Sequence, residues 1–392
     1  MFRKGKINRD VLLSLFIIAS GGMMAIGRFY DERLELFGIN FSIILSSVFI
    51  VLFISVSFLI KSIKINLNKI LLYIFYFILI ISNLVLWSVY GATDYGLEKF
   101  INLILIPLPI SLIIIEKFKI RDRNFMIKIL LWISILLFVV TLFNLSTLSS
   151  TRTGVLGGGP IVLSRWLCFG AAVVLFHPKI KRFKVIYMIL FLFAALFTGS
   201  RGPILSFFLA MTLYFLLNFR KVFFRVFALS FFVVLILFVT GVFEQLSQYK
   251  TVSRVYMNVE EGGLRKSTGR SLLFESFFQE IIEYPLGVGS GNFVEYSDRS
   301  NLFKNKTYYY PHNLFFEIAC EFGIITLLFF FIYLIQSIYL SFRINLIDKL
   351  KTGNMMFYTF VFLFLNSMVS GDLNDARLLF VFIPLMLVKE IE

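Results

Sequence analysis

Residues 41–60 read FSIILSSVFIVLFISVSFLI, an unbroken run of apolar and hydroxyl side chains without a single charge. A helix needs about 20 such residues to cross the hydrocarbon core of a bilayer, with a range of roughly 17 to 25. Similar runs recur at approximately 11–29, 70–90, 100–116, 125–144, 161–177, 185–199, 203–218, 222–242, 314–341, 355–370 and 377–389. The sequence therefore predicts an all-α fold, a polytopic transmembrane helix bundle with about twelve spans.

The composition of the whole chain agrees with this prediction. Of its 392 residues, 59% are hydrophobic and 16% are charged, and the mean hydropathy is +0.87. Soluble domains keep the apolar share near one half and the charged share near one quarter. The composition therefore excludes a soluble enzyme, a disordered chain and a secreted disulfide scaffold. The two cysteines, Cys168 and Cys320, lie inside or beside apolar spans and show no metal-site spacing.

Basic side chains are distributed unevenly between the two sides of these spans. The chain has 38 Lys and Arg, and one set of alternate loops holds 23 of them. More than half of the others fall in one long loop, 243–311, where charge has little influence on topology. Because short cytoplasmic loops are enriched in Lys and Arg, we expect both termini to be cytoplasmic and the long loop to face outward.

The long loop contains one segment with helical periodicity, Arg270–Glu283. Its apolar side is formed by Phe274, Phe277, Phe278, Ile281 and Ile282, and its polar side mostly by Glu275, Gln279, Glu280 and Glu283. We expect an amphipathic helix that lies at the outer interface or packs across the spans. The chain then divides into N-terminal transmembrane helices (1–150), helices with outer-end arginines (151–242), the extracytoplasmic loop (243–313) and C-terminal helices (314–392).

Two short irregular stretches interrupt this pattern. Residues 198–203, TGSRGP, separate two short spans and indicate either a tight hairpin or an interrupted helix. Irregular backbone at membrane depth must be buried in protein or line a wet cavity. Residues 285–292, PLGVGSGN, follow a helix rather than a strand, so they fail as a dinucleotide fingerprint and predict a flexible turn beside a site.

Arginines gather at the outer ends of the predicted spans. Arg152, Arg165, Arg201 and Arg377 occupy such ends, where topology requires no positive charge. A guanidinium presents a planar fork that suits phosphate, and it stays charged when water is removed. Ionisable groups at membrane depth are costly, so several together suggest a ligand or a polar partner. Internal ion pairs with Asp372 and Asp375 are the alternative for Arg377.

His312 marks the point where the long loop re-enters the membrane. It stands in the stretch PHNLFFE, residues 311–317, with Asn313 beside it and Glu317 shortly after it. An isolated histidine is more often structural than catalytic, but an imidazole near its natural pKa can take a proton from a sugar hydroxyl at neutral pH. His177, on the predicted cytoplasmic side, lacks comparable neighbours and is interpreted as structural.

These motifs together resemble the bacterial O-antigen ligase and O-antigen polymerase superfamily. The resemblance covers about residues 190–335, and its elements are TGSRGP at 198–203, STGR at 267–270, YPLGVGSGNF at 284–293, PHNLFFE at 311–317 and EFGI at 321–324. It implies a metal-independent integral-membrane glycosyltransferase of the GT-C type, without a cofactor. The donor would be a glycan on undecaprenyl pyrophosphate, used at the outer face of the bacterial inner membrane.

The resemblance also implies roles for single residues. Arg201 and Arg270 match arginines that hold the donor's pyrophosphate, and His312 matches a histidine that acts on the acceptor. The predicted substrate-binding set consists of Arg152, Arg165, Arg265, Asn313, Glu317 and Arg377. Of these, Arg152, Arg165 and Arg377 match no family motif and are included for their position and chemistry. The expected partners are an undecaprenyl-pyrophosphate-linked oligosaccharide, a lipid-linked acceptor glycan and membrane lipids, with a chain-length regulator as a further candidate and no nucleic acid.

Several functions stay open at this point. The aromatic-rich, weakly patterned first half resembles the polymerases, which favours joining of lipid-linked repeat units over transfer of finished glycan to lipid A-core by a ligase. A lipid-linked oligosaccharide flippase is less well supported, because it predicts internal symmetry, mid-membrane charges and no dominant outer loop. A non-catalytic scaffold for envelope assembly would need neither His312 nor the arginines.

Overall fold

The computed structural model describes residues 9–36, 39–59, 67–144, 159–178, 180, 182–219, 270–296, 310–343, 353–369 and 371–388. Apart from one short hairpin, β1 (Glu35–Leu36) against β2 (Ile39–Asn40), the regular structure in these residues is helical. The first half holds α1 (Arg9–Ile26), η1 (Glu32–Leu34), α2 (Phe41–Ser57), α3 (Leu67–Tyr90), α4 (Asp94–Leu105), α5 (Pro107–Lys117) and α6 (Ile120–Asn144). The second half holds α7 (Pro160–Phe176), α8 (Lys184–Phe197), α9 (Arg201–Asn218), α13 (Arg270–Glu283), α14 (Phe293–Tyr296), α16 (Leu314–Phe342), α17 (Gly353–Val369) and α18 (Arg377–Met386).

The predicted all-α polytopic fold is confirmed. Each predicted span that falls on described residues corresponds to a helix or, for α4 and α5, to a helix pair, whereas the span at 222–242 lies outside the described residues. Within the described residues, six helices are long and apolar enough to cross a membrane, with α4 and α5 counted as one. The break at Thr198–Ser200 separates α8 from α9, which form a hairpin against α7.

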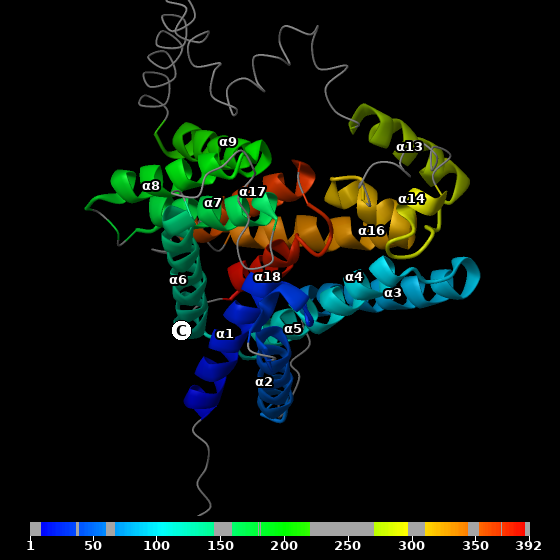
Figure 1. The fold of residues 1–392 in the computed structure, drawn as a ribbon, viewed down its shortest axis with the longest axis horizontal. Helices are drawn as coiled ribbons and strands as arrows, with labels where there is room; N and C mark the ends of the chain where they lie inside the picture. The colour runs from blue at the N-terminus through cyan, green and yellow to red at the C-terminus, as the bar shows by residue number, and fades with distance from the viewer. Residues whose placement is uncertain are drawn as a thin grey trace, which may run out of the picture.

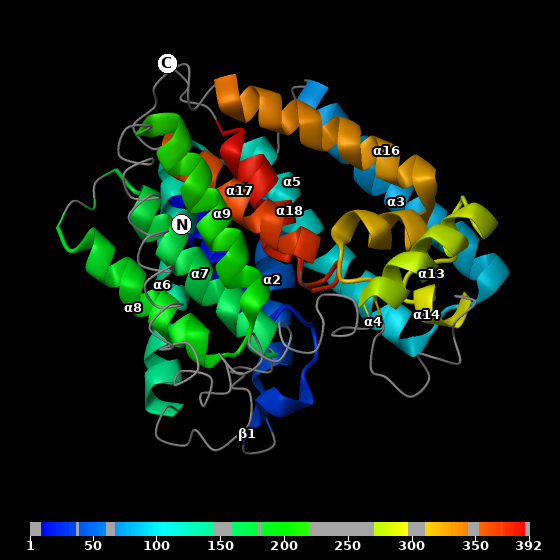
Figure 2. The same ribbon diagram turned by 90° about the horizontal axis from the view of Figure 1, so that it is seen from above.

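The helices pack around two buried ones, α7 and α18. Every residue of α7 from Leu163 to Phe176 is buried, and so is every residue of α18. Helix α7 contacts α6, α8, α9 and α17, while α18 contacts α5, α16 and α17. The helix axes are strongly tilted against one another. In Figure 1, α2 and α6 stand upright whereas α16 lies across the picture. In Figure 2, α16 runs alongside α3.

Contacts between helix ends agree with the predicted alternation of sides. At the predicted cytoplasmic ends, Lys69 Nζ lies 2.7 Å from Glu116 Oε2. There too, the Arg121 guanidinium lies 2.9 Å from Asp10 Oδ2. Helix ends that were predicted to share one side of the membrane are therefore neighbours in space.

Helix α16 is interrupted at Gly323, whose backbone (φ 88°, ψ 165°) is not helical. Three carbonyls beside the break accept hydrogen bonds from outside the helix. They are Cys320 from Val288 N–H (2.9 Å), Glu321 from Gly289 N–H (2.8 Å) and Phe322 from the Ser82 hydroxyl (2.8 Å). Backbone groups freed at membrane depth are costly unless other donors satisfy them. The break is thus stabilised by the glycine-rich segment 285–292 and by α3.

The glycine-rich segment needs its glycines for this close approach. A Cβ on Gly287 would lie 2.6 Å from the backbone nitrogen of Gly323, and Gly287 has a φ of +92°. A side chain at Gly287 would therefore both strain the backbone and collide with α16. The segment that the sequence predicted as a flexible turn is a cap on a broken helix.

Helix α13 has the predicted bounds, but its buried face differs from the prediction. Ser276, Phe277 and Glu280 are buried, whereas Phe278 is 58% and Ile282 80% exposed. Helix α13 packs against α16, where the ring of Phe277 stacks on Phe316 with centroids 3.9 Å apart. Glu280 was predicted to lie on the polar side of the helix, but it is buried in the structure. The face that packs on α16 is shifted by one position from the most apolar face.

Candidate functional site

A cavity of about 480 Å³ lies where several helix ends meet. It is bounded by the end of α1, the first turns of α4, α7 and α18, and the residues just before α16. Its polar side chains include Tyr95, Lys99, Tyr310, Asp372, Asp375 and Arg377. All of these helix ends belong to the side that the sequence predicts to be extracytoplasmic.

One wall of the cavity rests on a buried charge cluster. Lys99 of α4 donates to both carboxylate oxygens of Glu321, at 2.7 and 2.6 Å, and also pairs with Glu317. The side chains of all three residues are fully buried. Buried ions are stable only when they are paired and hydrogen-bonded. The cluster therefore locks α4 to the first half of α16.

The loop between α17 and α18 is tied to the same cluster. Glu317 Oε1 accepts a hydrogen bond from Leu373 N–H at 3.0 Å. The Tyr95 hydroxyl donates to Asp372 Oδ2, also at 3.0 Å. Glu317, which was predicted to bind substrate, thus contacts protein groups on two other elements. It holds the floor of the cavity in place.

Two of the predicted arginines converge on Asp375. Arg165 donates to the Asp375 carbonyl and lies 3.8 Å from its carboxylate. Arg377 approaches the other carboxylate oxygen, also at 3.8 Å. Burial raises the pKa of the Asp375 carboxyl, even though both guanidiniums counteract it. The structure therefore brings Arg165 and Arg377 together, with an internal acid between them.

Arg377 also holds the end of α1. Its guanidinium donates to the carbonyl of Met24 at 2.7 Å and to that of Ala25 at 3.4 Å. The last carbonyls of a helix lack partners within the helix, and a cation near them is favourable. Gly27 has a φ of +74°, a conformation that favours glycine, and a Cβ there would push the guanidinium away from these carbonyls. Arg377 thus lines the cavity while it serves as a cap.

His312 lies directly beside the cavity wall. Its ring packs edge-on against the ring of Tyr310, which lines the cavity, with centroids 4.5 Å apart. The backbone of His312 has a φ of +59°, which is uncommon for a residue with a side chain and is often found at functional sites. Burial and nearby acidic groups raise the pKa of Tyr310, so its phenol stays neutral and can donate a hydrogen bond.

Asn313 fixes the position of His312 in the fold. Its side-chain oxygen accepts hydrogen bonds from Phe315 and Phe316 N–H, which makes it the N-cap of α16. Its side-chain nitrogen donates to the Met368 carbonyl at 3.0 Å. Asn313 was predicted to bind substrate, but both ends of its amide contact protein. Its described contacts therefore position the neighbouring histidine.

Of the other predicted site residues, the structure describes only some. Arg201 is exposed at the first position of α9, and the neighbouring Ser200 carbonyl accepts from Ser164 of α7 at 3.5 Å. This contact brings the start of α9 close to Arg165. Arg270 is the first residue of α13, and its side chain lies outside the described part of the structure. Arg152 and Arg265 also lie outside the described residues.

Three charged groups that line the cavity were not predicted from the sequence: Arg28, Glu98 and Lys99. Lys99 had a signal, since an ionisable residue within an apolar helix indicates a functional or paired position. Among the described lining residues, the cations Arg28, Lys99 and Arg377 face the carboxylates of Glu98, Asp372 and Asp375. The cavity therefore offers both hydrogen-bond donors and hydrogen-bond acceptors to a polar ligand.

The fold and this cavity define an integral-membrane protein whose charged cavity lies among helix ends, next to a strained histidine. Residues 186–331 match the family model described as O-antigen ligase. This segment is therefore similar to the O-antigen ligase family, which supports the resemblance to the O-antigen polymerase and ligase superfamily. The matched segment contains Arg201, Arg270 and His312, so the motifs that carried the resemblance fall inside it. A search of curated proteins found no match.

Proposed function

We propose that the protein is an O-antigen polymerase, which joins undecaprenyl-pyrophosphate-linked repeat units at the outer face of the bacterial inner membrane. Both termini would lie in the cytoplasm, and the cavity would open to the periplasm. The observation that carries the proposal is the position of His312 beside a cavity that combines cations, carboxylates and phenols. The match of residues 186–331 to the O-antigen ligase family model supports polymerase or ligase activity in general.

The residues suit a direct displacement. The acceptor hydroxyl attacks the anomeric carbon of the donor, and His312 takes the hydroxyl proton as the new C–O bond forms. The bond from the anomeric carbon to the phosphate oxygen breaks, and its electron pair leaves with undecaprenyl pyrophosphate. General-base catalysis of this kind contributes typically 10²–10⁴ in rate.

The leaving group requires added positive charge. The described cations of the cavity are matched by as many carboxylates, so they cannot by themselves neutralise a diphosphate. We assign that role to Arg201 and Arg270, which begin α9 and α13. Fixed guanidiniums in a water-poor site stabilise developing charge, and removal of one such donor typically costs about 10²–10³ in rate. Arg165 and Arg377 would shape the cavity through Asp375.

An O-antigen ligase is the second candidate, because the matching family model carries that description. The two functions differ in the acceptor, which is a second lipid-linked glycan for a polymerase and lipid A-core for a ligase. A lipopolysaccharide gel of a deletion strain separates them. We expect core that carries a single repeat unit, whereas bare core with accumulated lipid-linked polymer would show a ligase and overturn the polymerase proposal.

A further inference from the structure

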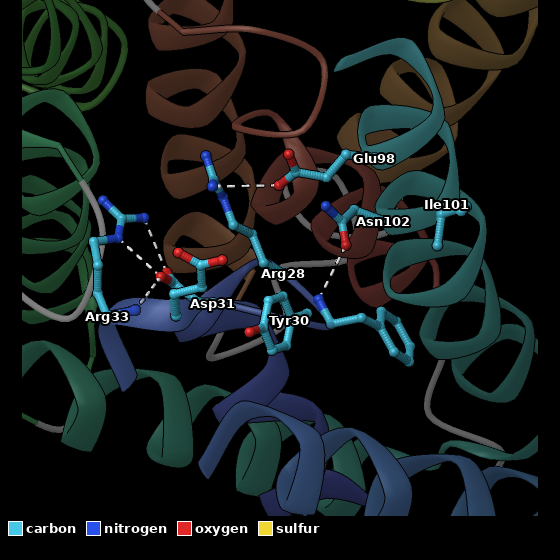
Figure 3. Close-up of a pocket in the computed structure, with 9 residues that line it drawn as sticks. Arg28, Tyr30, Asp31, Arg33, Glu98, Ile101 and Asn102 are labelled. Atoms are coloured by element: carbon cyan, nitrogen blue, oxygen red, sulfur yellow. Dashed lines mark hydrogen bonds and ion pairs between the residues drawn. The ribbon is translucent and has the colours of Figure 1, made fainter. Parts of the chain in front are cut away.

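A second pocket lies next to the cavity described above. It has a volume of about 530 Å³ and is formed by residues 28–33, between α1 and α2, together with one face of α4 (Figure 3). Arg28 and Glu98 line both the pocket and the cavity. Their side chains form an ion pair of 3.3 Å, and each is nearly half exposed. This ion pair therefore separates two adjoining compartments.

One buried amide in this pocket has an unused donor. Asn102 is 2% exposed, and its side-chain oxygen accepts a hydrogen bond from Phe29 N–H at 3.0 Å. Its side-chain nitrogen is buried and has no hydrogen-bond partner among the described residues. In Figure 3 this nitrogen points toward the space beside Arg28 and Glu98. A buried amide donor without a partner is costly, and a ligand acceptor would satisfy it.

The remaining groups of the pocket favour a neutral polar ligand. The Arg33 guanidinium binds both carboxylate oxygens of Asp31, at 2.8 and 2.9 Å, so this pair is already balanced. Counting Glu32 and Glu98, the lining has three carboxylates against two guanidiniums, which disfavours a phosphate. The ring of Tyr30 is half exposed on the pocket wall. Amide, carboxylate and guanidinium groups beside an aromatic ring match the hydroxyls and the apolar face of a sugar.

We propose that this pocket is a saccharide subsite, which binds one sugar ring of the glycan substrate while the reacting end lies in the adjoining cavity. The Asn102 amide nitrogen donates to a sugar oxygen, and the Glu98 carboxylate accepts from a hydroxyl. This inference rests on the proposed function, since it assigns part of the glycan that the reaction uses. It adds a determinant of glycan specificity on the α1–α2 connection and α4, outside the matched segment 186–331.

The test uses Asn102→Asp in the purified full-length protein. Aspartate keeps an oxygen for Phe29 N–H but replaces the amide donor with an acceptor. The matched control is Asn218→Asp, at the exposed C-terminal end of α9, where the predicted cytoplasmic helix ends meet. The probe is the repeat-unit oligosaccharide released from its lipid, and its binding is measured by calorimetry alongside turnover of the intact lipid-linked unit.

We expect Asn102→Asp to weaken oligosaccharide binding and to raise KM by about tenfold with kcat little changed, as loss of one hydrogen bond to a ligand predicts. Asn218→Asp should leave both values unchanged. Equal binding by wild type and Asn102→Asp would overturn the subsite, while normal wild-type turnover would leave the proposed function intact. Oligosaccharide binding that depends on Asn102, in a protein without turnover, would contradict the polymerase instead.

A second variant covers the case in which Asn102→Asp does not fold. Glu98→Gln keeps the shape of a half-exposed side chain and removes the charge that pairs with Arg28. It should weaken oligosaccharide binding in the same direction. If either variant changes inhibition by inorganic pyrophosphate but not oligosaccharide binding, the pocket holds the leaving group and the saccharide assignment is wrong.

Discussion

Lys99 of α4 and Glu321 of α16 form a fully buried ion pair across 222 positions of sequence, with Lys99 Nζ within 2.7 Å of both carboxylate oxygens. Glu321 lies two residues before the break in α16, and Glu317 completes the cluster one turn earlier. The pair joins the two halves of the chain beneath the cavity. The cavity therefore keeps its shape only while this ion pair is intact.

Replacement of Lys99 tests this relationship. Lys99→Met leaves two carboxyls without their cation, and breaking a buried pair typically costs about 3–5 kcal/mol of unfolding free energy. We expect a large drop in the melting temperature of the detergent-solubilised protein. Arg121→Gln, which breaks the exposed pair with Asp10, should cause no measurable change. A Lys99→Met protein as stable as wild type would show that the cluster does not hold α4 to α16.

His312→Ala should abolish polymer formation in a deletion strain. Loss of a general base lowers the rate by about 10²–10⁴, while the variant should still be found in the membrane at wild-type amount. The matched control is His177→Ala. His177 is half-buried and follows the last residue of α7, at the helix end that is predicted to be cytoplasmic. Normal polymer ladders from His312→Ala, or a null phenotype from His177→Ala, would contradict the assignment of the two histidines.

Arg201→Ala and Arg270→Ala test the stabilisation of the leaving group. Each should lower turnover by about 10²–10³, and lysine at the same position should restore part of the rate because it returns the charge without the planar fork. The measurement is turnover of a lipid-linked repeat unit by purified protein. Full activity of both alanine variants would remove these arginines from the mechanism.

Chelation tests the predicted metal independence. EDTA should leave the turnover of the purified protein unchanged, since the proposed mechanism assigns charge stabilisation to guanidiniums. Activity that is lost on chelation and restored by a divalent cation would overturn this part of the mechanism.

Glu280 provides a prediction about pH. Burial, together with the nearby Glu321 and Glu283, raises the pKa of Glu280 well above the ordinary 4.5. Above pH 4.5 the unfolded chain releases the proton of Glu280, whereas the folded protein keeps it until the pH reaches the raised pKa. The free energy of unfolding therefore falls as the pH rises from the ordinary pKa to the raised one. Glu280→Gln should flatten the dependence of melting temperature on pH in the range above the ordinary pKa of 4.5. Glu295→Gln, at an exposed position of α14, should retain the wild-type slope, and identical slopes for all three proteins would refute the prediction.

Helix positions were predictable because hydropathy is a local property of the chain. Helix α13 has the predicted bounds, and α1, α3, α9 and α16 agree with the predicted spans to within a few residues. Lys99 was missed because the predicted span began at residue 100, whereas α4 begins at Asp94 and includes it. A hydropathy window that excludes charged residues places the start of a predicted span after a lysine that belongs to the helix. Its carboxylate partners are on a distant helix that local patterns do not identify.

The arginines show the limit of reasoning from position alone. Their location at helix ends was predictable from the spans, but their partners depend on tertiary packing. Arg377 meets the carbonyls of α1, more than 350 residues earlier in sequence, and Arg165 meets Asp375. The internal pairing of Arg377, the alternative considered from sequence, is present in the structure. The side chain of Glu280 was misplaced for the same reason, since helix periodicity does not specify which face a neighbour covers.

The cap that segment 285–292 places on α16 has a consequence for engineering this protein. By sequence the segment falls within the predicted long loop 243–311, yet it belongs to the helix bundle by its hydrogen bonds to the carbonyls of Cys320 and Glu321. A chimera that exchanges the loop between two relatives must therefore carry this segment together with its own copy of α16. An exchange cut between them would leave a transmembrane helix with unsatisfied carbonyls, and the hybrid would fail in assembly before its sugar specificity could be compared.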